Sequence, residues 1–213
     1  MTDINILQAS LSWRWILDRM IPLLPGPGTA PFAELIRSLQ PYGVNPQEVV
    51  WEASGNRLSD VALHFTLVEG INLRLTYSGF ELFVSTLSGE HNVALPQIAD
   101  HVLNSLQSID VDARQARVRV ARSSHLGLKG QDAGELIEAH LCGHRAAGAL
   151  VPDAFGYQIR LNARPEVVEM RIVVARSLIF PGALYLDFSA VYKGVPHPSE
   201  VATKFRSDYD EVL

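Results

Sequence analysis

The sequence repeats one coarse pattern about 100 residues apart: three segments of alternating apolar and polar residues, then one amphipathic segment. The segments are residues 58–67, 71–77, 80–85 and 95–109 in the first block, and 155–161, 168–174, 184–190 and 199–213 in the second. Alternation is typical of strands that bury one face, and apolar residues three and four apart are typical of helices. The pattern predicts two strand-strand-strand-helix units, which either duplication or the chance recurrence of hairpins before helices would produce.

The alternation also predicts which side chains face the core. In residues 61–67, Leu63 and Phe65 alternate with His64, and in residues 71–77, Leu73 alternates with Arg74. One face of each strand is therefore apolar and the other polar. The elements assemble most simply into an α+β fold, mainly an antiparallel sheet with helices on one face.

The segments outside the repeat complete the expected domain organisation. Residues 4–21 are apolar on more than one side, which predicts a helix that carries Trp13 and Trp15, and the proline- and glycine-rich residues 22–31 predict a hinge. A strand is expected at 115–121 and a helix at 131–142. The expected parts are a helical segment at 1–46, a first block at 47–112 and a second block (β-α-βββ-α) at 113–213, together one compact domain.

Composition narrows the function classes. The 213 residues carry a net charge of −5, which argues against a protein that coats DNA by neutralising phosphates. The single cysteine excludes an intramolecular disulfide framework, and neither a signal peptide nor an apolar run long enough to span a membrane is evident. We therefore expect a cytoplasmic protein without a membrane span.

Potential metal ligands crowd together at only one place in the sequence. They are Glu135, Glu138, His140, Cys142 and His144. On one regular helix, the two histidines would project from one side, and the cysteine and the glutamates from the other. His140 and His144 keep the spacing of helical zinc ligands but lack the glutamate of the metalloprotease motif, so a metal site there is a minor alternative. We expect no metal and no cofactor.

Motifs for covalent catalysis or phosphate binding are also weak. Ser123, Ser124 and His125 are adjacent, but no Gly-x-Ser-x-Gly elbow occurs, and the lone Cys142 is more typical of an inert buried residue. The glycines at 127 and 130 lack the Gly-Lys-Ser/Thr ending of a phosphate loop. Catalysis is left open, with no catalytic residue assigned.

The polar face of the expected sheet is the more informative surface, because arginine and tyrosine favour recognition surfaces. It gathers Arg74, Arg117, Arg119, Arg160, Arg171 and Tyr185. Together with Trp13 and Trp15 these are the predicted partner-binding residues. The alternative is a solvated face on which Arg160 and Arg171 pair with Glu169 and Asp187.

The C-terminal third resembles the closing segment of an uncharacterised bacterial family. The resemblance lies in the sequence from Phe180 to Gly194, FPGALYLDFSAVYKG, and in the expected helix after it. It implies a bacterial α+β domain of unknown function and carries over no site residue.

Three functions follow as hypotheses. The first is a non-catalytic protein-binding subunit or adaptor of a larger assembly, with a protein partner or a second copy of itself. The second is a small-molecule-binding or enzymatic domain with an apolar pocket between sheet and helices, and with His64, His140, His144 or Asp187 at its mouth. The third, and less favoured, is a single-stranded nucleic-acid binder that uses the arginine face.

Overall fold

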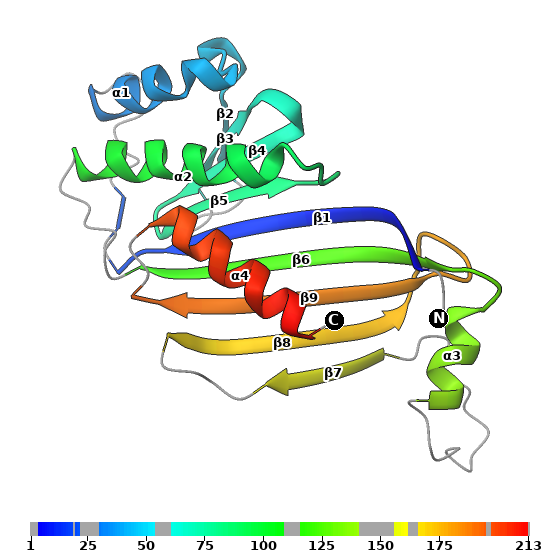
Figure 1. Ribbon diagram of the computed structural model, residues 1–213. Coiled ribbons are helices and arrows are strands. Elements are labelled where there is room, and N and C mark those ends of the chain that lie inside the picture. Colours follow the sequence, from blue (N-terminus) through cyan, green and yellow to red (C-terminus); the bar gives the residue numbers. More distant parts are fainter. Residues whose placement is uncertain are drawn as a thin grey trace.

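The structure is a computed structural model that describes residues 4–18, 20–21, 30–53, 61–108, 116–140, 156–161, 166–194 and 197–212. In chain order its strands and α-helices are β1 (Ile4–Ile16), α1 (Ala30–Leu39), β2 (Val50–Ala53), β3 (Val61–Thr66), β4 (Ile71–Thr76), β5 (Gly79–Val84), α2 (His91–Gln107), β6 (Arg117–Leu128), α3 (Ala133–His140), β7 (Gly156–Leu161), β8 (Val167–Arg176), β9 (Leu184–Lys193) and α4 (Pro198–Val212). The strands form one antiparallel sheet in the order β2-β3-β4-β5-β1-β6-β9-β8-β7 (Figure 1). The predicted α+β fold is confirmed.

The two predicted blocks are the two wings of this one sheet. From the central pair β1–β6, the order outward is β5, β4, β3 on one side and β9, β8, β7 on the other. The second block follows the predicted order β-α-βββ-α, and the first follows it too once β1 and α1 are included, with β2 added at its edge. The shared order of elements is the one that duplication of a single unit would produce. Duplication itself stays a hypothesis.

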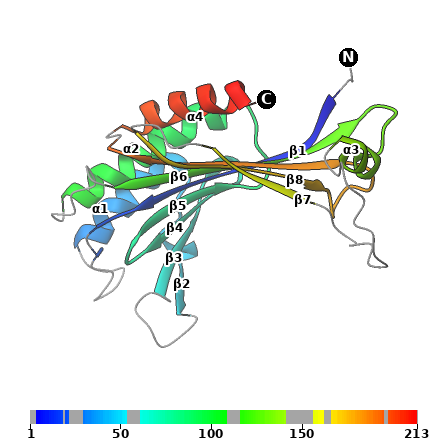
Figure 2. The same cartoon turned by 90° about the horizontal axis from the view of Figure 1, so that it is seen from below.

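Helices α1, α2 and α4 lie on one side of the sheet, which we call the helix face, and the opposite side is the open face (Figure 2). α1 packs on α2, and α4 runs across the central strands. α3 lies at one end of the sheet, where the amide of Ala133 donates to the carbonyl of Gly182 over 3.0 Å.

The helix face carries the core because alternate residues of each strand point toward it. One row across four neighbouring strands shows the rule: Trp13, Leu82, Leu73 and Phe65 lie opposite one another, and each is buried. Full burial of such a side chain stabilises the fold by about 1.5–3 kcal/mol before entropy is counted.

The turn between β4 and β5 depends on a glycine that also touches the central strand. Gly79 has a φ of +150°, and a Cβ there would lie 1.9 Å from the carbonyl oxygen of Trp15. Only glycine lets this turn lie against β1. The position therefore fixes how the first wing joins the centre of the sheet.

The predicted N-terminal helix is wrong, because residues 4–16 form strand β1 in the middle of the sheet. Ala9, Leu11, Trp13 and Trp15 occupy alternate positions and are all buried. That is the period of a strand, and tryptophan and isoleucine also favour strands. Within the predicted helical segment 1–46, residues 4–16 are therefore a strand, whereas α1 is a helix. Of the hinge predicted at residues 22–31, residues 22–29 lie outside the described residues and residues 30–31 begin α1.

Two further element boundaries differ from the prediction. The expected strand at 115–121 is longer, since β6 continues to Leu128. α2 begins at His91, so Pro96 lies inside the helix and not beside its start. Both shifts change which side chains reach the sites described below.

Candidate functional site

Four cations gather on the open face at one end of the three central strands, β1, β6 and β9. Arg14 lies directly opposite Arg119, and Arg117 lies directly opposite Lys193. All four residues are exposed. Opposed side chains in a sheet are about 5 Å apart at Cβ, and like charges in such pairs are destabilising. We call these residues the central cation cluster.

The acids on the described part of the open face offset this cluster only in part. Glu81 lies opposite Arg14 and also accepts a hydrogen bond from the Ser12 hydroxyl at 2.6 Å, so it brings one negative charge beside the cluster. Glu52 contacts His64 at 2.7 Å. Within the described residues, none of the four clustered cations has a side-chain hydrogen bond or an ion pair. The described part of the chain therefore carries an excess of positive charge at this end of the central strands.

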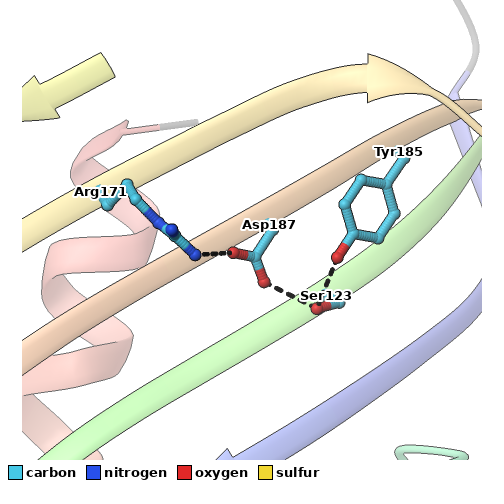
Figure 3. A network of polar contacts seen from close by, with 4 residues as sticks. All are labelled: Ser123, Arg171, Tyr185 and Asp187. Atoms are coloured by element: carbon cyan, nitrogen blue, oxygen red, sulfur yellow. Dashed lines mark hydrogen bonds and ion pairs between the residues drawn. The ribbon is translucent and has the colours of Figure 1, made fainter. Parts of the chain in front are cut away.

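A different arrangement holds the arginine on β8. The Arg171 guanidinium lies 3.2 Å from the Asp187 carboxylate, whose other oxygen accepts a hydrogen bond from Ser123 at 2.7 Å. Tyr185 donates in turn to the Ser123 hydroxyl at 3.2 Å (Figure 3). Asp187 is only 8% exposed although it lies on the open face. This network links β6, β8 and β9, so Arg171 has a structural role. The pairing of Arg171 with Asp187 is the one expected under the alternative of a solvated face.

The remaining predicted partner-binding arginines flank these two groups. Arg74 lies opposite Glu81 on β5, and exposed Arg160 lies opposite Arg171 on β8. All five predicted arginines therefore belong to the open face, together with Tyr185. Their role in binding a partner stays a prediction.

Trp13 and Trp15 are placed elsewhere. They lie on the helix face of β1, with exposed fractions of 3% and 2%, and their rings pack together with a centroid separation of 5.6 Å. Trp15 also stacks on Phe80 at 4.7 Å. The premise that these residues line an exposed docking helix is wrong, and they form part of the core.

The histidines weighed for catalysis or metal binding are only partly described. His125 Nδ1 lies 2.9 Å from the Ser177 hydroxyl, but that oxygen accepts from the amides of Ile179 and Phe180, so it caps a turn. His144 and Cys142 lie outside the described residues, as does the side chain of His140. Among the described residues no group of His, Cys, Asp and Glu is placed to hold a metal ion.

A cavity of about 340 Å³ opens on the helix face, between β1, β6, the start of α2 and α4. Its position between sheet and helices matches the expected apolar pocket. Of the residues expected at its mouth, His64 and Asp187 belong to the open face, while the side chain of His140 and all of His144 lie outside the described residues. His91 and Arg122 are among the residues that line the cavity.

Arg14 and Arg122 were not among the predicted site residues, although the alternation in the sequence indicates where both lie. Arg14 was assigned to a helix, so its position opposite Arg119 was not visible until β1 was placed beside β6. Arg122 lies one residue beyond the predicted end of its strand. The period of two, carried on through both segments, would have placed Arg14 on the open face and Arg122 on the helix face.

Comparison of the chain with known protein families and with curated proteins gives no match. No helix in the described part of the chain is long and apolar enough to cross a membrane.

Proposed function

We propose that the chain is a non-catalytic protein-binding subunit or adaptor whose partner presents an acidic segment to the open face. The observation that carries this proposal is the facing of like charges in the central cation cluster, where Arg14 lies opposite Arg119 and Arg117 lies opposite Lys193. Like charges in facing positions destabilise a sheet, and a partner that brings carboxylates between them removes the repulsion.

Charge segregation supports an acidic partner. The whole chain has a net charge of −5, so the positive charge of the central cation cluster contrasts with the rest of the molecule. Such a patch raises the association rate with a negatively charged surface and orients it on approach. Phe83, 39% exposed and opposite Ser12 on the same face, adds apolar contact area beside the cluster.

A protein partner is favoured over a nucleic-acid strand because phosphate binding needs an extended run of cations. The cluster spans three strands, and beyond it the open face carries the acids Glu52 and Glu169. The net negative charge of the chain would repel the phosphates of a long strand that extend beyond the cluster. Binding of single-stranded nucleic acid is therefore the competing outcome of the test.

The test is fluorescence anisotropy at low salt with two labelled probes, a ten-residue polyglutamate peptide and a ten-nucleotide oligothymidylate. The double variant Arg14→Glu/Arg119→Glu removes the centre of the cluster. The double variant Arg37→Glu/Arg206→Glu changes the net charge equally at exposed helix positions and serves as control.

We expect the peptide to bind the wild type and the control alike, and to bind the open-face variant at least about tenfold more weakly. Equal binding by both variants would overturn the proposal. Preferential binding of the oligothymidylate would replace it with the nucleic-acid alternative. A partner captured from the cells that produce this protein counts only when the purified partner shows the same dependence on Arg14 and Arg119.

A further inference from the structure

Arg122 breaks the pattern of the helix face. Val118 and Val120 precede it on the same side of β6, and both are buried beneath the helices. Arg122 continues this register and lies opposite Leu11 on one side and Phe188 on the other. A charged side chain at an apolar position lowers stability unless a partner balances it, so such a position calls for a functional reason.

The guanidinium of Arg122 has no such partner in the described structure. Its Nε atom is buried without a hydrogen bond, and no carboxylate forms an ion pair with it. Its Cζ atom lies over the ring of Tyr209, 4.4 Å from the ring centroid. A contact of this kind contributes about 0.5–2 kcal/mol and supplies no hydrogen-bond acceptor.

A second buried donor lies in the same place. The indole Nε1 of Trp13 also has no hydrogen-bond partner within the described residues, although Trp13 is only 3% exposed. Trp13 lies opposite Val120, which places it diagonal to Arg122 on the neighbouring strand. Each buried donor left unpaired costs about 1–3 kcal/mol. Two such donors at one place point to an acceptor that arrives from outside the chain.

Both residues line the cavity on the helix face. Its volume of about 340 Å³ is at the small end of the usual range for ligand sites. Leu11, Leu95 and Phe205 supply apolar walls from β1, α2 and α4. The site therefore combines an apolar body with a charged donor.

The histidine and the other charged side chains of the cavity are engaged or balanced, and Asn92 is exposed and uncharged. His91 Nδ1 accepts from the amide of Ser88 at 2.8 Å, and its Nε2 donates to the carbonyl of Glu69 at 2.9 Å. Arg206 and Asp210 are exposed and stand four residues apart on α4, so their charges offset each other near the rim. Arg122 is left as the one unbalanced charge of the lining.

We infer that this cavity binds a small amphipathic carboxylate. The carboxylate accepts hydrogen bonds from the Arg122 guanidinium, whose planar fork matches its two oxygens. The apolar body of the ligand lies against Leu11, Leu95 and Phe205. A single guanidinium balances one negative charge, which favours a monocarboxylate over a phosphate group.

The test is isothermal titration calorimetry at neutral pH with octanoate, with 1-octanol as its uncharged counterpart, and with inorganic phosphate. Arg122→Met removes the charge and keeps an apolar stem of similar length. Arg119→Met makes the same change on the opposite face of the same strand and is the control. Ala202→Leu narrows the cavity from α4 without altering any charge.

Octanoate should bind the wild type and Arg119→Met equally, and Arg122→Met about 10- to 100-fold more weakly, as loss of a hydrogen bond to a charged group predicts. Octanol should bind the wild type and Arg122→Met with the same low affinity. Ala202→Leu should weaken both ligands.

Equal octanoate affinity in Arg122→Met and Arg119→Met would overturn the inference, as would phosphate binding that competes with octanoate. A wild-type protein that binds neither octanoate nor octanol would show that the two donors are satisfied by buried water alone.

Discussion

Strand β6 carries arginines on both of its faces, and their surroundings differ. On the open face, Arg117 and Arg119 lie exposed among other cations. On the helix face, Arg122 lies against an aromatic ring at the wall of a cavity. Arg171 on β8 shows the third possibility, because Asp187 balances its charge.

The comparison distinguishes arginines that stabilise the fold through an ion pair from arginines that contribute little to its stability. Arg171 is paired, and its removal should weaken the protein. No ion pair within the described chain holds the central cation cluster or Arg122, so their removal should cost little stability and should instead cost binding. Variants of both kinds test whether the distinction holds.

The largest effect is expected for Asp187→Asn. The change removes the counter-charge of Arg171, which then faces Arg160 alone, and it weakens the hydrogen bond from Ser123. The free energy of unfolding should fall by about 1–3 kcal/mol in urea denaturation. Glu169→Gln, at an exposed position of β8, is the control and should change it by less than about 0.5 kcal/mol. An equal loss of unfolding free energy in both variants would show that the network does not stabilise the protein more than an exposed acid does.

A smaller effect of opposite sign is expected for Arg119→Glu. The substitution turns a like-charge pair with Arg14 into an opposite-charge pair across β1 and β6. The free energy of unfolding should rise by about 0.2–1 kcal/mol, and the gain should shrink as salt is added. Arg37→Glu on α1 provides the matched charge change at an exposed helix position. A loss of stability in Arg119→Glu alone would mean that Arg119 has a structural role.

The smallest effect is expected at Asp100, on the helix layer that covers the core. Burial raises the pKa of Asp100, and the nearby His197 and His101 oppose that shift. The folded state therefore binds this proton more tightly than the unfolded state, so stability falls as pH rises through the raised pKa. Asp100→Asn should remove this part of the pH dependence and slightly raise the melting temperature at neutral pH. A neutral-pH melting temperature below that of the wild type would contradict this sign.

Much of the fold follows from alternation in the sequence. The period of two placed Leu63, Phe65 and Leu73 on one side and the arginines on the other, and both assignments agree with the strand register. The error at residues 4–16 arose because apolar side chains at 11, 13 and 15 were accompanied by others at 7 and 16, which widened the apolar surface enough to resemble a helix.

The sites were harder to predict because each depends on which strands are neighbours. The central cation cluster needs β1 beside β6 and β6 beside β9, pairings that join residues far apart in the chain. No local sequence motif indicates either pairing. Arg122 was closer to prediction, since its register follows directly from Val118 and Val120 once the strand is extended.

The most direct test of this separation is the free energy of unfolding of Arg122→Met, measured in urea without added ligand. We expect a value equal to or above that of the wild type, because methionine keeps the apolar stem and removes an unpaired buried donor. A loss of about 2 kcal/mol or more would contradict it and would make Arg122 a structural residue.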